Sequence, residues 1–239
     1  MKNISYKGKK FSILGDSLST FEGYSEPRYA EYYDMTQKLK SRVLRVDDTW
    51  WGAVISLLEG ELLVNNSISG STVAWQKSYE IASHACSEQR TASLERDGEH
   101  PEVIMVYVGT NDWGRGARLY ADASGRSASN DPLTFYEAYS VMIERLQHNY
   151  PHAEIWCFTL AKSRYSSAQE FEFPYCYAGV HIEKYCDVIR NCAKAHNCRL
   201  IDLYAYAEPY DTVDGVHANL EGMHTIASAV IKQVGRFER

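Results

Sequence analysis

Short runs of apolar residues alternate along the chain with longer stretches in which apolar residues recur every three or four positions. The short runs predict β-strands, and the recurrence predicts helices with one buried face. The predicted strands are residues 10–14, 62–65, 103–108, 154–158 and 199–201. The third run is apolar throughout, which is typical of a central strand covered on both faces.

Two segments show the helical pattern most clearly. The first carries its apolar face on Phe135, Ala138, Tyr139, Met142, Ile143 and Leu146, and the last carries it on Leu220, Met223, Ile226, Ala227, Val230 and Val234. We expect Asp131 to cap the first of these helices, with Pro132 as its first residue. The alternation of strands and helices predicts an α/β fold with a parallel sheet between two layers of helices. Binding sites in such folds form at the carboxyl ends of the strands.

In three stretches the apolar residues follow neither a helical nor a strand spacing: residues 20–46, 113–130 and 159–177. Each follows a predicted strand, so all three are expected at the edge of the sheet where sites form. The chain shows no internal repeat and no linker of low complexity. We therefore expect a single domain over residues 1–239.

Composition and charge narrow the possible functions. With 239 residues, 45% of them hydrophobic, the chain has enough apolar material for one sizeable core. A formal net charge of -6 disfavours binding to nucleic acids or to anionic membranes. No segment approaches the roughly 20 apolar residues that span a bilayer. The apolar run at 11–14 is too short for a signal-peptide core, so we expect a cytoplasmic protein.

The six cysteines do not predict a metal site or a disulfide framework. They are Cys86, Cys157, Cys176, Cys186, Cys192 and Cys198, and none forms a C-x-x-C pair. We expect small buried thiols instead.

Four short polar motifs lie at the predicted edge, three directly after strands and one before the last helix. They are Gly15-Asp16-Ser17-Leu18-Ser19, Asn65-Asn66-Ser67-Ile68-Ser69-Gly70-Ser71, Gly109-Thr110-Asn111-Asp112 and Asp214-Gly215-Val216-His217. Each motif alone is also explained by an ordinary turn, loop or helix cap, and for residues 65–71 taken alone the ordinary loop is the better explanation. Their shared position favours one common site over four unrelated turns.

Ser17 and His217 are the residue types of a nucleophile and its base. A serine where a helix begins exposes its hydroxyl beside free backbone N–H groups. A histidine can take the proton of that hydroxyl, and the carboxylate of Asp214 can fix its tautomer and stabilise the imidazolium. His224 and Asp211 are the alternative base and carboxylate. They fit less well, because His224 falls inside the last helix and Asp211 lies further from His217 along the loop.

Gly70 and Asn111 are candidates for binding a developing oxyanion. Glycine has no side chain to keep its N–H from a reacting carbonyl, and the asparagine amide is a hydrogen-bond donor. Asp16 adjoins Ser17 and is expected to support the turn. Asp112 is expected to anchor its loop rather than to catalyse.

With these motifs in this order, the chain resembles the SGNH, or GDSL, hydrolase superfamily, whose sequence blocks supply Ser17, Gly70, Asn111 and His217. The resemblance implies a flavodoxin-like three-layer α/β/α fold with a mainly five-stranded parallel sheet. It also implies hydrolysis of acyl esters with no metal or other cofactor, and an oxyanion hole formed by the first three of these residues. One departure is Ala218, where many members have proline after the histidine.

The substrate is suggested by aromatic residues in the three irregular stretches, namely Tyr24, Tyr29, Tyr32, Tyr33, Trp113, Tyr120, Tyr165, Tyr175 and Tyr177. Flat polar walls suit a sugar or another polar small molecule with a short acyl group, such as O-acetyl, better than a lipid chain. Packing of the loops explains the same tyrosines equally well. Arg115, Arg118 and Arg126 could meet an anionic substrate or only solvent.

Other functions share parts of this pattern. Lipases, thioesterases and acyltransferases use the same machinery on other acyl groups. A non-catalytic module on a flavodoxin-like sheet could hold a flavin phosphate in the loop after the first strand, but it would leave Asp214 and His217 unexplained. An inactive family member that binds acylated glycans is disfavoured, because all four block residues are present.

Overall fold

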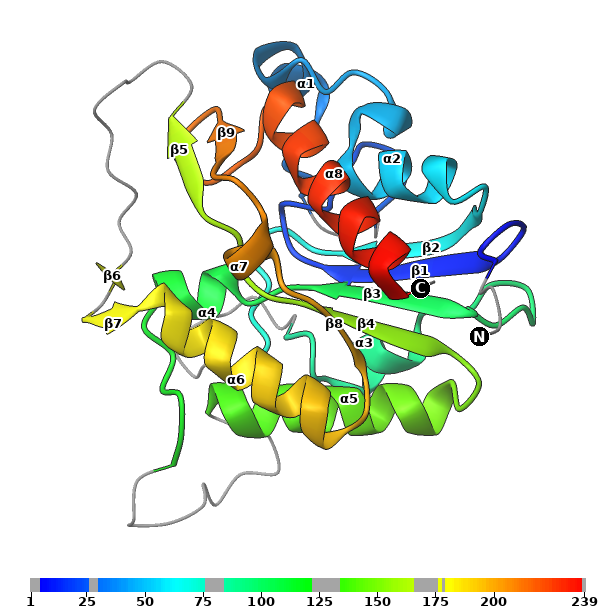
Figure 1. Ribbon diagram of the computed structural model, residues 1–239, viewed down its shortest axis with the longest axis vertical. Helices are drawn as coiled ribbons and strands as arrows, with labels where there is room; N and C mark the ends of the chain where they lie inside the picture. The colour runs from blue at the N-terminus through cyan, green and yellow to red at the C-terminus, as the bar shows by residue number, and fades with distance from the viewer. Residues whose placement is uncertain are drawn as a thin grey trace.

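Five parallel strands form the central sheet of the computed structural model, which describes residues 5–25, 30–75, 84–121, 134–165, 176–177 and 179–237. In sheet order they are β2 (Glu61–Ser67), β1 (Lys10–Gly15), β3 (Val103–Tyr107), β4 (Glu154–Phe158) and β8 (Arg199–Ile201). Every neighbouring pair is parallel. All five predicted strands are confirmed, and the first two extend beyond the predicted ends. Figure 1 shows the sheet crossing the molecule between two groups of helices.

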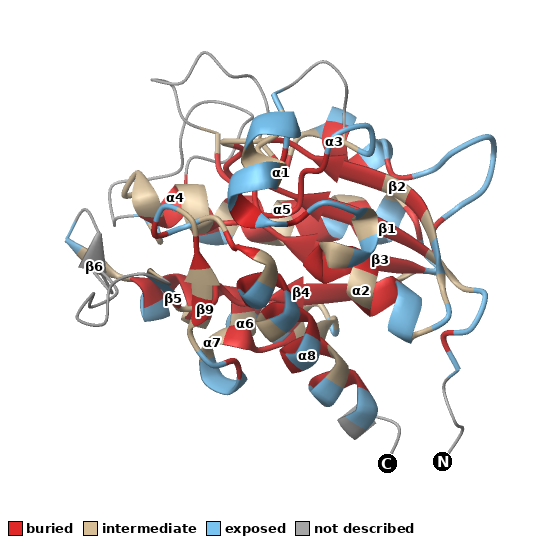
Figure 2. Cartoon of the chain, turned by 90° about the horizontal axis from the view of Figure 1, so that it is seen from above, coloured by how far each residue is buried: buried red, intermediate tan, exposed pale blue. Residues whose placement is uncertain are grey.

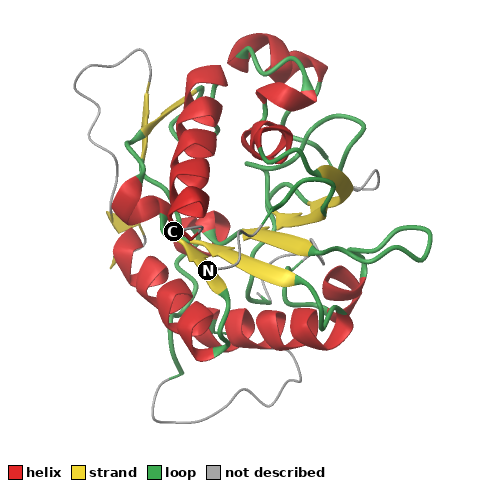
Figure 3. Cartoon of the chain, turned by 45° about the vertical axis from the view of Figure 1, so that its right-hand side comes forward, coloured by secondary structure: helices red, strands yellow, loops and turns green. Residues whose placement is uncertain are grey.

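Helices cover both faces of the sheet, as predicted (Figures 1 and 3). One face packs against α2 (Trp50–Leu57) and α8 (Leu220–Phe237), and the other against α5 (Phe135–Asn149) and α6 (Ile182–Ala195). The short helix α3 (Glu88–Ala92) contacts α5. Side chains of β3 alternate between the two cores: Met105 joins the first, whereas Ile104 and Val106 join the second. All of β3 is therefore buried, as Figure 2 shows.

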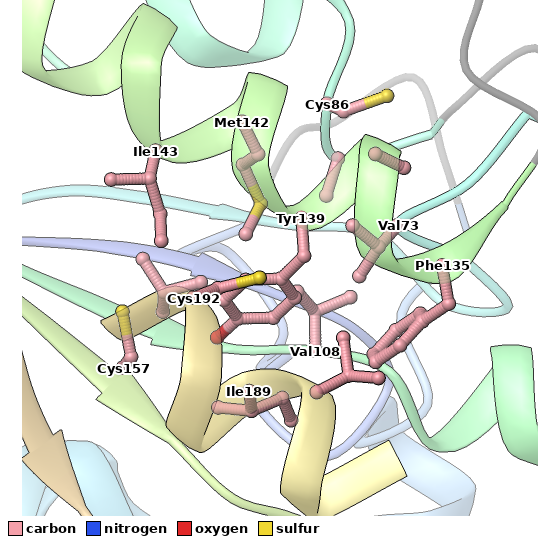
Figure 4. Close-up of a cluster of buried hydrophobic side chains, with 14 of the residues drawn as sticks. Val73, Cys86, Val108, Phe135, Tyr139, Met142, Ile143, Cys157, Ile189 and Cys192 are labelled. Atoms are coloured by element: carbon pink, nitrogen blue, oxygen red, sulfur yellow. The ribbon is translucent and has the colours of Figure 1, made fainter. Parts of the chain in front are cut away.

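The core under α5 follows the predicted apolar face, because all six residues assigned to that face are buried. In Figure 4, Tyr139 and Met142 of α5 lie beside Cys192 of α6, above Cys157 of β4. The thiols of Cys86, Cys157, Cys186 and Cys192 are free and buried, and Cys198 is free and half-buried. The side chain of Cys176 lies outside the described part of the structure. Four cysteines therefore serve as small core residues.

Helix α5 begins later than predicted. Its N-cap is Thr134, whose hydroxyl accepts the N–H of Glu137 and donates to the Glu137 carboxylate over 2.6 Å. This exchange satisfies a backbone donor that the helix itself leaves unpaired, which explains why the cap lies at this residue. The helix therefore does not begin at the predicted position, and the prediction of Asp131 as its N-cap and Pro132 as its first residue is wrong. Both residues lie outside the described ranges.

The chain also forms smaller elements: α1 (Met35–Ser41), η1 (Val46–Asp48), α4 (Thr110–Gly114), β5 (Ser163–Tyr165), β6 (Cys176–Tyr177), β7 (Val180–His181), α7 (Leu203–Tyr206) and β9 (Tyr210–Thr212). Helix α1 lies within residues 20–46, a stretch in which the apolar residues show no helical spacing. Its large apolar side chains, Met35 and Leu39, are 67% and 72% exposed, so it has no buried stripe that a pattern could reveal.

The order of the strands creates a switch point beside β1. The chain runs from β1 to β2 on one side and then crosses to β3 on the other. Loops leaving β1 and β3 therefore diverge at the carboxyl ends of these strands, where binding sites form in such sheets. Ser17 follows β1 and Asn111 follows β3 at this edge. In the described ranges, no helix combines the length and the apolar character that a membrane span requires.

Candidate active site

Ser17, His217 and Asp214 meet at the carboxyl edge of β1. The Ser17 hydroxyl oxygen lies 2.8 Å from Nε2 of His217, a residue 200 positions later in the chain. Nδ1 of His217 lies 2.8 Å from Oδ2 of Asp214. A hydroxyl, an imidazole and a carboxylate in this sequence of contacts have the geometry of a nucleophile, its base and an orienting group.

The turn that carries Ser17 is tight and needs a glycine before it. A Cβ on Gly15 would lie 2.6 Å from the hydroxyl oxygen of Ser67, on the neighbouring strand β2. The backbone carbonyl of Asp16 accepts the N–H of residue 19 at 3.0 Å, and its carboxylate accepts the N–H of Leu18 at 3.0 Å. Asp16 therefore fixes the two residues that follow the Ser17 position in this turn.

Ser19 fixes the same turn to the layer of α2. Its carbonyl accepts the indole N–H of Trp51 at 3.0 Å and the side-chain amide of Asn65 at 2.9 Å. Its hydroxyl accepts the indole N–H of Trp50 at 3.2 Å. Both tryptophans are buried, so these hydrogen bonds are shielded from water. The sequence motifs gave no indication of this role for the two tryptophans.

The loop that carries the histidine is held by hydroxyl groups. Each backbone carbonyl from residue 214 to residue 218 accepts one hydrogen bond. Hydroxyl groups donate to four of them: Tyr165 to residue 214 (2.8 Å), Ser163 to residue 215 (2.6 Å), Tyr210 to residue 216 (2.7 Å) and Tyr33 to residue 218 (2.8 Å). The carbonyl of His217 accepts the backbone N–H of Val213 at 2.8 Å. Consecutive carbonyls without a helix or sheet partner need such donors when water is excluded. For Tyr33 and Tyr165, packing of the loops is therefore the better of the two sequence-based explanations.

The carboxylate of Asp214 receives hydrogen bonds on both oxygens. Oδ1 accepts the backbone N–H groups of Val216 at 3.0 Å and of His217 at 2.8 Å. Oδ2 accepts from the His217 ring and from the Tyr32 hydroxyl, each at 2.8 Å. Partial burial by itself raises the pKa of Asp214, but the hydrogen bonds from His217 and Tyr32 outweigh it and hold that pKa well below its usual value. The group is therefore an anion at neutral pH.

The loops after β2 and β3, which carry Gly70 and Asn111, are tied together. The Asn111 amide donates to the carbonyl of Ser71 over 3.0 Å. The Asp112 carboxylate accepts the backbone N–H groups of residues 73 and 74 at 2.7 and 3.0 Å. Gly70 has a φ of 75°, a conformation that glycine adopts without strain. The Asp112 carboxyl group thus joins the loop after β3 to the loop after β2.

Two buried carboxyl groups flank this region. Burial raises the pKa of Asp112 to about 7 and that of Asp16 to about 6. Both values exceed those of an unfolded chain, so the stability that these groups contribute is present below about pH 4 and is lost as the pH rises through 6 to 7. Each of these two groups thus contributes most to stability when it is protonated.

Arg90, a buried residue of α3, joins the nucleophile strand to the Gly70 loop. Nη2 donates to the carbonyls of Gly15 at 3.0 Å and Asn66 at 2.6 Å. Nε donates to the Asn66 side chain at 2.8 Å, and Nη1 donates to the Ser71 hydroxyl at 2.5 Å. A planar guanidinium can serve several acceptors at fixed angles, which an ammonium group cannot. Sequence analysis missed Arg90, because α3 has five residues and no periodic pattern.

Replacing Arg90 by methionine is expected to lower the free energy of unfolding by about 3 kcal/mol or more, because several buried acceptors lose their donor. Arg90→Lys should recover only part of this loss. Urea unfolding followed by circular dichroism measures both values. Arg96→Met, the same change at an exposed position, is the control. If Arg90→Met were as stable as this control, the bridging role would be refuted.

Other residues considered from the sequence lie elsewhere. The Asp211 carboxylate pairs with Nε of Arg164 at 2.5 Å, and His224 is exposed on α8. Arg115 donates to the carbonyl of Gly70 over 2.8 Å, so it borders the site. Tyr29, Arg126 and Tyr175 lie outside the described residues, as do the side chain of Tyr177 and its contacts.

Among the residues that are described, no three His, Cys, Asp or Glu side chains are grouped to hold a metal ion.

Comparison with protein-family models identifies one family, and crystal structures with the same fold are known. Residues 9–234 match the GDSL-like lipase/acylhydrolase family. Crystal structures described as GDSL-like lipases are similar: one from Bacteroides ovatus (26% identity, 97% of this chain and 99% of that chain, TM-score 0.72) and one from Bacteroides uniformis (27%, 96% and 96%, 0.70). A carbohydrate acetylesterase from Sinorhizobium meliloti shares the fold at 14% identity, over 96% of this chain and 99% of that chain, with a TM-score of 0.62. The search of curated proteins found no match.

Proposed function

Because the chain belongs to the GDSL-like lipase/acylhydrolase family and is an ester hydrolase, we propose that Ser17, His217 and Asp214 are its catalytic triad and that it removes a short acyl group from a carbohydrate. The two 2.8 Å contacts that link the three side chains carry the proposal. They already have the hydrogen-bond distances that proton transfer requires.

In the first step, Ser17 Oγ attacks the acyl carbon as its proton passes to Nε2 of His217. The Nδ1–H remains donated to Asp214, whose charge stabilises the imidazolium. Collapse of the tetrahedral intermediate expels the alcohol, which takes the proton from Nε2. A water molecule deprotonated by His217 then attacks the acyl-serine, and the acid leaves as Ser17 regains its proton.

The developing oxyanion is held by the backbone N–H groups of Ser17 and Gly70 and by the side-chain amide of Asn111. One amide N–H of Asn111 donates to the carbonyl of Ser71, which fixes the orientation of the amide. The second N–H is the one assigned to the oxyanion. Each such donor contributes about 2.7–4 kcal/mol to stabilisation of the transition state.

Two observations support a short acyl group on a polar scaffold. Tyr24 and Tyr120, in two of the edge loops, are 46% and 49% exposed and offer flat faces with polar rims. The fold is shared with a carbohydrate acetylesterase. Trp113 does not contribute, because it is buried and donates its indole N–H to the carbonyl of Val180. Lipase or thioesterase activity with the same triad is the competing proposal.

Acyl-chain preference tests the proposal. We expect p-nitrophenyl acetate to be hydrolysed with a higher kcat/KM than the butyrate, and the octanoate to be slowest. Acetylated xylose should release acetate at a comparable rate. A fluorophosphonate should stop turnover and add one phosphonyl group, found by mass spectrometry on the peptide that contains Ser17.

Each other outcome has a clear meaning. A preference for octanoate would keep the serine mechanism and transfer the substrate to lipids or thioesters. Labelling of a different residue would reject Ser17. Failure to hydrolyse any ester, with the protein folded, would reject the proposed reaction and favour a binding module.

A further inference from the structure

Tyr32 contacts both partners of the nucleophile. Its ring lies parallel to the His217 imidazole, with 3.4 Å between ring centroids and 11° between planes. Its hydroxyl donates to Oδ2 of Asp214 over 2.8 Å. We propose that Tyr32 is a positioning residue that holds the imidazole and the carboxylate in their active orientation. This inference rests on the proposed function, because it assigns His217 as the base.

The phenol completes the hydrogen bonding of the Asp214 carboxylate. A carboxylate has about four acceptor positions. Two backbone N–H groups occupy Oδ1, and the His217 ring and the Tyr32 hydroxyl share Oδ2. The Asp214 side chain is 43% exposed, so water would compete for this oxygen if the phenol were absent. The Tyr32 hydroxyl therefore fixes the plane of the carboxylate at the oxygen that the histidine uses.

The stacked ring acts on the imidazole itself. A flat side chain parallel to the His217 ring prevents the ring from tilting away from Ser17. An aromatic face also attracts a cation, and the imidazole becomes a cation only as it takes the proton. The contact is therefore more favourable in the transition state than in the resting enzyme, which is the condition for accelerating a reaction.

Tyr32 is itself coupled to the nucleophile turn. Its backbone N–H donates to the hydroxyl of Thr20 over 2.9 Å, and that hydroxyl donates to the carbonyl of Ser17 over 3.1 Å. Its ring also packs edge-on against Tyr33, at 5.0 Å and 77°. Tyr33 in turn donates to the carbonyl of Ala218, beside the histidine. The segment 30–33 thus connects the backbone of the nucleophile with the loop that carries its base.

Two substitutions separate the contributions of the ring and the hydroxyl. Tyr32→Leu removes both, and we expect kcat for p-nitrophenyl acetate to fall about 100-fold, because the base is no longer held in place. Tyr32→Phe keeps the ring and should lower kcat about 3- to 10-fold, which corresponds to one hydrogen bond. KM should change little in either variant. Tyr136→Phe, which removes a phenol hydroxyl from an exposed position on α5, is the matched control.

The pH profile gives a readout that a merely structural role would not change. In the described part of the chain, the carboxyl groups of Asp214, on the same loop, and of Asp16, on the nucleophile turn, interact with His217. In Tyr32→Phe only exchanging water can take the place of the phenol at Oδ2 of Asp214, so the carboxylate loses its fixed donor and more of its charge acts on the imidazolium. We therefore expect the acid limb of kcat/KM to move to higher pH in Tyr32→Phe, while the control keeps the wild-type profile.

Phosphonylation by a fluorophosphonate measures Ser17 activation without an alcohol substrate. Its rate should fall in the order wild type, Tyr32→Phe, Tyr32→Leu, at melting temperatures close to that of the wild type. Equal rates in all three proteins, or a rise in KM with unchanged kcat, would overturn the positioning role and place Tyr32 in substrate binding. A protein in which Ser17→Ala is as active as the wild type would instead refute the proposed function, so the two failures are distinguishable.

Discussion

Replacing Ser17 by alanine is expected to lower kcat/KM for p-nitrophenyl acetate by about 10⁶-fold, close to the limit of detection. The Cβ that remains cannot form an acyl-enzyme, and the imidazole of His217 loses the hydroxyl that lies 2.8 Å away. Initial rates at saturating and limiting substrate measure the loss. Ser19→Ala, on the same turn, should lose less than about tenfold, since it removes one neutral hydrogen bond to Trp50.

A double variant tests whether Ser17 and His217 act as a unit. His217→Ala alone should cost about as much as Ser17→Ala, and the double variant should be no worse than either. Additive losses would mean that the two residues contribute independently, which contradicts the proposed proton transfer. Retention of more than about 1% of wild-type activity in Ser17→Ala would exclude Ser17 as nucleophile.

Asp214→Asn is expected to lower kcat by about 10⁴-fold with little change in fold. The asparagine oxygen can replace Oδ1, which accepts backbone N–H groups of the same loop. Its NH₂ group would then face Nδ1 of His217 and the hydroxyl of Tyr32. An NH₂ group donates to Nδ1, so the ring proton moves to Nε2, and the histidine can no longer accept the proton of Ser17.

Asp211→Asn is the matched control for this change, since Asp211 is the other carboxylate near the histidine loop and pairs with Arg164. It should keep kcat within about threefold of wild type, the effect expected of an ion pair at the surface. Melting temperatures of both variants show whether the loop is intact. A large loss in Asp211→Asn together with an active Asp214→Asn would reverse the assignment of the orienting carboxylate.

Much of the architecture could be predicted from short stretches of the sequence. Strand β3 is apolar at every position, and α5 repeats its apolar residues at helical spacing, because each element must bury its own face. The exposed helix α1 has no such face and was not predicted. The true cap of α5, Thr134, was also missed, because a threonine and an aspartate three residues apart are both acceptable caps on sequence grounds.

The sequence by itself determined the strands of the sheet, the order of the motifs, and the residue types suited to acyl transfer, since these depend on neighbouring positions in the chain. Only the tertiary structure decided which side chains support them. The hydroxyls of Tyr32 and Tyr33 and the guanidinium of Arg90 reach partners far away in the chain. A tyrosine that holds a loop and a tyrosine that lines a pocket look alike in sequence, because the difference lies in the acceptor that the fold brings to the hydroxyl.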